Sequence, residues 1–198
     1  MTSTVRADLI RACNPGMRYQ DAPPWSWRKL ARALGQQGIW AVLEYRWRRW
    51  IRGLPSPWRS LILPLGWMTH KLTETLTGIS ISPRAEFGPG LRINHFGGII
   101  VGPGVVADEN CSLSQDVTLG DHRGSPRLGS CIYVAPGAKV FGAIVVGDHV
   151  AIGANAVVNE DVPPYSTAVA GRATVLEGRG NLATDQLSVA EQPQFVDD

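Results

Sequence analysis

The sequence predicts a mainly β protein: a parallel β-helix of six-residue repeats with a small α-helical cap at its N-terminus. Two observations carry this prediction. Aliphatic residues recur every six positions over the second half of the chain, and the first 78 residues instead show helical spacing of apolar side chains. At 198 residues and 44% hydrophobic content, the chain suits one moderate domain plus an appendage, and two large domains would not fit.

The six-residue register holds through thirteen positions. They are Ile81, Phe87, Ile93, Val101, Ala107, Leu113, Leu119, Leu128, Val134, Val140, Val146, Ile152 and Val158. A strand repeats every two residues and an α-helix about every 3.6, so neither explains this period. Each hexapeptide is therefore expected to form a short strand and a turn, with three such sides closing one coil and the thirteen side chains pointing inward. The competing interpretation, a sandwich of short strands with Gly-rich turns, does not require a single register.

Two interruptions of the register predict the functional site. The spacing is eight between Ile93 and Val101 and nine between Leu119 and Leu128, so two and three residues are inserted. The first interruption contains residues 94–98 and the second contains residues 121–127. Because a regular prism has flat walls, insertions are where a pocket can form.

The front of the chain is predicted to be helical. Residues 26–52 read as helix interrupted near Gly35 and Gly38, and residues 61–76 form a second short helix before Gly78. We expect these helices to cap one end of the solenoid. A membrane-surface anchor is the alternative, because Trp and Arg on an amphipathic helix are also what such an anchor requires. The expected division is a helical region at 1–78, a β-helix domain at 79–176 and a disordered acidic tail at 177–198.

Charge and cysteine content exclude several classes of function. Residues 1–78 carry twelve Lys and Arg against four Asp and Glu, and residues 177–198 carry one against five. The basic residues are mixed with Trp and Leu, which favours a solvated helical face over a nucleic-acid surface. Cys13, Cys111 and Cys131 show neither paired nor metal-type spacing, which indicates a reducing compartment and no metal. With neither a signal peptide nor a transmembrane segment in the pattern, a cytoplasmic protein is expected.

Histidines in the two interruptions are the candidates for chemistry. A hydroxyl is a poor nucleophile until its proton is removed, and a histidine of near-neutral pKa can remove it. His95 is therefore the predicted general base, against the alternative of a histidine merely exposed on a loop. His122 is a second pocket candidate, with a solvent-exposed loop residue as the equal alternative. His70 and His149 are interpreted as ordinary surface or capping residues.

At these positions the sequence resembles the serine O-acetyltransferases of the hexapeptide-repeat superfamily, in a short form without the larger helical domain. The matching runs are residues 90–95 with 98–102, 115–120, 136–142 and 152–158 leading to 161–164. The resemblance implies a left-handed β-helix and acetyl transfer from acetyl-CoA to a small hydroxyl-bearing acceptor. It also implies a homotrimer with active sites between neighbouring prisms, and no permanently bound cofactor.

The resemblance also assigns roles to individual residues. It makes His95 catalytic and places Asn94, Ser80 and Ser125 around the acceptor, where His122 is the further candidate from the second interruption. The CoA arm is expected to pass Gly120, Pro136 and Ala154 and to reach Arg172, whose guanidinium suits a phosphate.

Three departures from the family pattern bear on the acceptor. Asn94 and Ser80 stand where the family has aspartates, and Ser125 stands where it has a histidine before proline. Losing carboxylates that would hold the amino group of serine favours a sugar or pathway-intermediate hydroxyl over serine. A non-catalytic trimeric scaffold is the third alternative, and the intact His95 position disfavours it.

Overall fold

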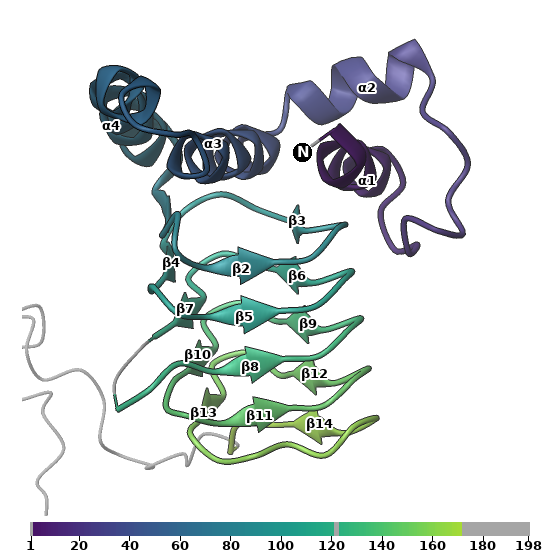
Figure 1. Cartoon of the computed structure of the whole chain (residues 1–198). Coiled ribbons are helices and arrows are strands. Elements are labelled where there is room, and N and C mark those ends of the chain that lie inside the picture. The colour runs from purple at the N-terminus through teal and green to yellow at the C-terminus, as the bar shows by residue number, and fades with distance from the viewer. Residues whose placement is uncertain (1, 121–122, 172–198) are drawn as a thin grey trace, which may run out of the picture.

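The computed structural model describes residues 2–120 and 123–171, in which a layer of helices covers one end of a β-solenoid (Figure 1). The helices are α1 (Thr2–Cys13), α2 (Trp27–Leu34), α3 (Gln37–Arg52) and α4 (Trp58–Thr77). The strands are β1 (Ile79–Ile81), β2 (Glu86–Phe87), β3 (Arg92–Ile93), β4 (Ile99–Val101), β5 (Val106–Ala107), β6 (Ser112–Leu113), β7 (Thr118–Leu119), β8 (Arg127–Leu128), β9 (Tyr133–Val134), β10 (Lys139–Val140), β11 (Val145–Val146), β12 (Ala151–Ile152), β13 (Val157–Val158) and β14 (Thr167–Ala168).

The strands form three parallel sheets, which are the three walls of a prism. Sheet A has the order β1-β4-β7-β10-β13, sheet B the order β2-β5-β8-β11, and sheet C the order β3-β6-β9-β12-β14. In Figure 1 the strands of sheet B run to the right across the front, and the chain returns behind them while it descends, which is a left-handed winding. The predicted parallel β-helix of hexapeptides is confirmed.

The core of the prism consists of the predicted inward positions. All thirteen residues of the six-residue register are buried, each at 5% exposure or less. Equivalent residues stack between coils, as Val101, Leu119 and Val140 do along sheet A. Backbone groups bond from coil to coil as well, so each turn of the solenoid supports the next.

The helical layer differs from the predicted one in three respects. The expected helix at 26–52 is two helices, with the break at Gly35 as predicted, whereas Gly38 lies inside α3. A Cβ at Gly38 would lie 2.7 Å from the Ile93 carbonyl oxygen, so glycine lets α3 approach β3 closely. Helix α4 begins at Trp58, ahead of the expected start, and ends at Thr77, where Gly78 caps it with a left-handed φ of 65°. Helix α1 was not predicted.

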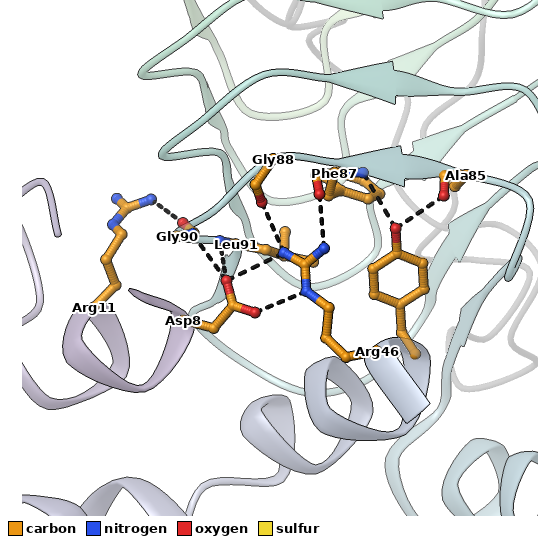
Figure 2. A network of polar contacts seen from close by, with 9 residues as sticks. Asp8, Arg11, Arg46, Ala85, Phe87, Gly88, Gly90 and Leu91 are labelled. Atoms are coloured by element: carbon orange, nitrogen blue, oxygen red, sulfur yellow. Dashed lines mark hydrogen bonds and ion pairs between the residues drawn. The ribbon is translucent and has the colours of Figure 1, made fainter. Parts of the chain in front are cut away.

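A buried ion pair joins the helices to the first coil (Figure 2). The Arg46 guanidinium on α3 donates to the Asp8 carboxylate on α1 through Nε at 2.8 Å and Nη2 at 3.2 Å. It also donates to the carbonyl oxygens of Phe87 and Gly88, both at 2.7 Å. Both charged side chains are almost fully buried, so their pairing is what makes that burial tolerable.

The Asp8 carboxylate and Tyr45 complete this joint. One Asp8 oxygen accepts from the backbone amides of Gly90 and Leu91, both at 2.8 Å. The buried Tyr45 hydroxyl donates to the Ala85 carbonyl at 2.8 Å. Asp8 and Arg46, which lie 38 residues apart in the sequence, thus satisfy carbonyl and amide groups at the open end of the solenoid.

His70 is a residue of α4 whose side chain faces α3 and is only 16% exposed, so the interpretation of it as an ordinary surface or capping residue was wrong. Its ring is 3.7 Å from the Glu44 carboxylate, which also pairs with Arg48. Burial raises the pKa of Glu44, and burial followed by the charge of Arg48 lowers the pKa of His70. His149 is exposed and stacks on Tyr165, with ring centroids 4.8 Å apart.

The helices end at Thr77 and the first strand begins at Ile79. The division of the chain into domains stays a prediction, and residues 177–198 lie outside the described part. No helix within residues 2–120 and 123–171 combines the length and apolar character needed to cross a bilayer.

Candidate active site

Three coils show what a regular corner between sheets C and A looks like. Each has four residues, at 114–117, 135–138 and 153–156. Backbone bonds stack these corners: Gly137 N donates to Gln115 O at 3.0 Å, and Asn155 N donates to Pro136 O at 2.9 Å. Gln115, Pro136 and Ala154 therefore occupy equivalent places along one edge of the prism.

The first coil departs from this pattern by two residues, His95 and Phe96. Asn94 lies above Ser114, with Nδ2 donating to the serine Oγ at 3.4 Å. Gly97 lies above Gln115, because its carbonyl accepts from Asp116 N at 2.9 Å. The two residues between them have no counterpart in the lower coils. His95 and Phe96 are both exposed, so the inserted pair stands out from the corner as a bulge.

The bulge is fixed from above and from below. Gly97 N donates to the Thr77 carbonyl at the end of α4, at 2.9 Å. Gly98 has a φ of 66°, and a Cβ there would lie 1.9 Å from the Asp116 Oδ1 atom. Only glycine adopts this φ readily and leaves room for the Asp116 carboxylate, so the fold itself needs glycine at position 98.

Two amide oxygens at this corner have no hydrogen-bond partner among the described residues. They are Asn94 Oδ1 and Gln115 Oε1, both buried. Unpaired buried acceptors are exceptions in folded proteins and call for an explanation. Asn94 directly precedes His95 and Gln115 lies beneath Gly97 at the same corner, so both oxygens are candidates to orient the imidazole or to accept from a bound substrate.

Ser80 lies close to the bulge but on the wall rather than the corner. It points outward from β1, and its backbone is in register with Ile100 on β4. The carboxylate of Glu74 on α4 lies beside it. The pKa of Glu74 is lowered, chiefly by the Lys71 ammonium at 2.7 Å and further by the hydroxyl of Ser80.

The sequence argument missed two carboxylates near the bulge. Glu74 comes from a helix, outside the six-residue register, and no local spacing connects it with Ser80. Asp116 was inside a matching run, but only the stacking of corners shows that its carboxylate lies against Gly98. Carboxylate oxygens therefore remain near this site although positions 80 and 94 are neutral, with the charge of Glu74 paired to Lys71.

The second interruption lies at the other edge of sheet A, between β7 and β8. Ser125 Oγ donates to the Pro103 carbonyl of the coil above at 3.0 Å, so this hydroxyl supports the loop. Gly120 begins the same loop, with Phe141 below it. His122 lies outside the described residues, and its predicted role stays a prediction.

The structure thus divides the predicted residues between two edges of sheet A. His95 and Asn94 share one edge with Pro136 and Ala154, whereas Gly120 and Ser125 lie along the other. Ser80 is on the wall between them, and Arg172 is outside the described residues. A three-residue strand spans roughly 10 Å, so one prism does not bring the two groups together around a single small substrate.

Within residues 2–120 and 123–171, no group of three or more His, Cys, Asp or Glu side chains could hold a metal ion. The edge between sheets C and A, here called the first edge, carries an exposed imidazole near amide and carboxylate oxygens. This arrangement suits proton transfer to and from a hydroxyl.

Comparison with known proteins finds serine acetyltransferases among the curated relatives. Serine acetyltransferase of Helicobacter pylori is 42% identical over 111 residues, covering 54% of this chain and 65% of the relative. Serine acetyltransferase of Synechococcus elongatus is 35% identical over 161 residues, covering 79% and 63%. The chain thus spans somewhat less than two thirds of the length of these curated relatives. No family model matches the chain.

Solved structures give the same kind of neighbour. Serine acetyltransferase of Neisseria gonorrhoeae, in complex with serine, superposes with a TM-score of 0.67 at 26% identity, covering 88% of this chain and 68% of that one. The Brucella abortus enzyme also has a TM-score of 0.67 at 26% identity, covering 84% and 64%.

The chain is a hexapeptide-repeat protein of the parallel β-helix class. Within that class it is serine acetyltransferase-like, in sequence and in fold, as the motifs at 90–102 and 115–120 predicted.

Proposed function

We propose that the chain is an acetyl-CoA-dependent O-acetyltransferase in which His95 is the general base. The observation that carries this proposal is the inserted pair at the first corner. The fold is regular along this edge except where it exposes an imidazole, and that imidazole sits at the position the family resemblance makes catalytic. A non-catalytic scaffold has no need for this bulge.

In the proposed reaction the His95 imidazole takes the proton of the acceptor hydroxyl. The hydroxyl oxygen forms a bond to the thioester carbonyl carbon of acetyl-CoA. The resulting tetrahedral intermediate breaks its carbon–sulfur bond, and the departing CoA thiolate receives the proton from the imidazolium. The products are the O-acetyl ester and free CoA thiol, and His95 returns to its neutral form.

Around His95 we assign supporting roles by position. The oxygens of Asn94 and Gln115 are placed to orient the imidazole or the acceptor, and Ser80 lines the wall on the acceptor side. Pro136 and Ala154, lower on the same edge, would bound the CoA arm. Arg172 and His122 keep their proposed roles as phosphate and pocket residues.

We further propose that the working unit is a homotrimer. Gly120 and Ser125 lie on the opposite edge of sheet A from His95, so each prism presents two incomplete halves of a site. In a cyclic assembly the first edge of one copy can face the second edge of its neighbour, which completes the site once per interface.

The acceptor we propose is serine, since the relatives reported above are named for it. The argument for a neutral acceptor was the loss of carboxylates at positions 80 and 94. Asp116 beside Gly98 supplies negative charge in the same region, and the Glu74 carboxylate, which pairs with Lys71, adds acceptor oxygens beside Ser80; both weaken that argument. The proposed location is the cytoplasm, where free thiols such as those of Cys13, Cys111 and Cys131 persist.

An acceptor panel tests this function. Purified protein with acetyl-CoA is assayed for free thiol release with L-serine, homoserine, glucose and glucosamine in separate reactions. We expect thiol release that depends on L-serine, with O-acetylserine as the product by mass spectrometry. Thiol release only with a sugar would contradict serine as the acceptor and keep the acetyl-transfer reaction. No release with any acceptor would contradict the acetyltransferase activity itself.

A further inference from the structure

Exposed apolar side chains concentrate in the helical layer. Of the twenty large hydrophobic residues that are exposed in the described part, thirteen lie before residue 79. Five of these thirteen are tryptophans. The predicted reaction uses none of them, and an apolar surface of this extent usually marks an interaction site.

Helix α3 has a Trp-rich side that faces away from the solenoid. Gly38 and Tyr45 contact the first coil and so define its inner side. At about 100° per residue, Trp40, Trp47 and Trp50 lie roughly half a turn from these two residues. Trp40 is 40% and Trp50 38% exposed, and the rings of Trp47 and Trp50 stack with centroids 5.0 Å apart.

Helix α4 has a leucine stripe on the corresponding side. Glu74 and Trp67 face the solenoid, because the first lies beside Ser80 and the second shares a groove with Pro83. The stripe of Leu61, Leu65, Met68 and Leu72 lies about half a turn away from them, so it points outward. Its four side chains are 72%, 46%, 58% and 60% exposed.

These residues of α3 and α4 are together called the Trp–Leu face. They are Trp40, Trp47 and Trp50 of α3 and Leu61, Leu65, Met68 and Leu72 of α4. In Figure 1, α3 and α4 lie side by side above the first coil, so the two outward sides belong to one end of the molecule.

The layer that carries the Trp–Leu face is strongly basic at its surface. Residues 1–78 hold twelve Lys and Arg against four acids. Asp8 and Glu44 are buried in ion pairs, while Asp21 pairs with Arg18 and Glu74 with Lys71. Within the described residues, Arg28 and Arg32 of α2 are exposed and form no ion pair with an acid. Arg52 is exposed and unpaired as well, but it lies on the inner side of α3, in the groove with Pro83.

We propose that the Trp–Leu face docks on the surface of an anionic phospholipid bilayer. Leucine side chains would enter the boundary between headgroups and acyl chains, and indole rings prefer the headgroup level. Exposed arginines would meet lipid phosphates. A second copy of this chain is a poorer occupant, because two such faces brought together would repel each other through their excess positive charge.

Docking in this way requires no helix to cross the membrane. The helices lie along the membrane surface and the prism projects from it. In the proposed cyclic trimer, three Trp–Leu faces lie at the same level along the axis, so one membrane plane can contact all three at once and raise the overall affinity.

Vesicle co-sedimentation of the full chain tests the proposal. Vesicles of phosphatidylcholine alone are compared with vesicles of equal phosphatidylcholine and phosphatidylglycerol. We expect binding to the anionic vesicles that weakens as salt rises, and at least about tenfold weaker binding to the neutral ones. No binding to the phosphatidylglycerol vesicles at low salt would overturn the proposal.

Matched variants locate the contact. Leu65→Ser with Leu72→Ser removes two exposed side chains of the stripe and should reduce partitioning at least about tenfold. Val145→Ser with Val169→Ser makes comparable changes at exposed positions of the solenoid, 53% and 75% exposed, and should leave binding unchanged. Equal loss in both variants, or in neither, would contradict docking through the Trp–Leu face.

Tryptophan fluorescence gives a readout that needs no variant. Lipids brominated near the headgroup should quench the wild-type emission on anionic vesicles, because the Trp side chains would lie at that depth. Unquenched emission despite sedimentation would contradict the proposed depth. A concentration-dependent self-association that the Leu65→Ser, Leu72→Ser protein loses, without lipid binding in the wild type, would identify the second copy as the occupant instead.

Discussion

The inserted His95–Phe96 pair shows how single residues turn a regular corner of the prism into a candidate site. The corner below has four residues and holds its backbone by bonds to its neighbours, so it has no freedom to present a side chain. Two extra residues push the imidazole outward, while Gly97 and Gly98 return the chain to the regular path. The cost is local, because the inward residues Ile93 and Val101 keep their register with Leu113 and Leu119.

Asn94 is the residue whose change should report most directly on the acceptor. A carboxylate at this position would face the ammonium group of a serine held beside His95. Asn94→Asp should therefore raise kcat/KM for L-serine by roughly tenfold, as expected for a charge-assisted hydrogen bond. Acetylation of a neutral diol, measured in the same thiol assay, serves as the control and should not improve. Equal effects on both acceptors would show that Asn94 does not face the amino group.

How much of the site the sequence reveals depends on how regular the surrounding pattern is. His95 could be predicted because a strict repeat makes every insertion visible. Glu74 could not, since it lies on a helix and meets Ser80 only through tertiary packing. The separation of His95 from Ser125 was equally hidden. The spacing shows how many residues each insertion contains, but it does not show that sheet A lies between the two insertions.

Among the elements, α1 and α3 are joined to the first coil by one buried charge pair. Arg46→Met would leave the Asp8 carboxylate and the carbonyls of Phe87 and Gly88 without their donors. Breaking a buried pair in this way costs about 3–5 kcal/mol. We expect a loss of that order in the free energy of unfolding by urea. Arg52→Met, which removes an exposed arginine from the same helix, should change it by less than about 1 kcal/mol.

Helix α1 and this joint were beyond prediction for related reasons. The first thirteen residues have no strong apolar stripe, so the helix is stabilised by tertiary contacts that local spacing does not show. The ion pair between Arg46 and Asp8 was hidden as well, because the two residues lie 38 positions apart and no local spacing connects them.

The α3–α4 contact should be sensitive to pH through His70. Burial and Arg48 lower its pKa, so the folded protein holds this ring neutral where the unfolded chain, with a pKa near 6.5, takes up a proton. The contribution of His70 to stability is therefore complete above about pH 6.5 and is lost as pH falls from there towards the folded pKa. The charged groups that face His70 are Glu44, Arg48, Lys71 and Glu74, and they are the same in the wild type and in the variant described next.

His70→Gln isolates this contribution. Thermal unfolding followed by circular dichroism between about pH 7.5 and 5.5 should show a smaller drop in Tm for the variant than for the wild type. The raised pKa of Glu44 acts in the opposite direction, but it is common to both proteins. If the two Tm profiles run parallel across this range, His70 is not held neutral by the fold.

For the whole molecule, the division of the site between two edges predicts assembly. Light scattering at micromolar concentration should give three times the mass of the 21.4 kDa chain. A monomer with full activity would contradict a site shared between copies.

The thirteen-position register predicted the prism from sequence alone, but it did not predict how copies assemble. Outward residues such as Ile100 and Val157 follow no regular spacing that would indicate an interface with another copy.

Mixed assemblies test the shared site. His95→Asn removes the base from one edge, and Gly120→Glu places a side chain with charge on the other. Each variant alone should be inactive. Co-refolded mixtures should recover part of the activity, because some interfaces then combine two intact edges. An inactive mixture whose scattering shows mixed trimers would place the whole site within one prism.

The most direct test of the central claim is the turnover of His95→Asn with acetyl-CoA and L-serine, measured as free thiol release. Asparagine keeps the size and polarity of the exposed side chain but cannot accept the hydroxyl proton at neutral pH. We predict a fall in kcat of at least about 10²-fold, with unchanged thermal unfolding, whereas His149→Asn at the far end of the solenoid retains full activity. A His95→Asn protein with kcat within about threefold of wild type would contradict general-base catalysis by His95.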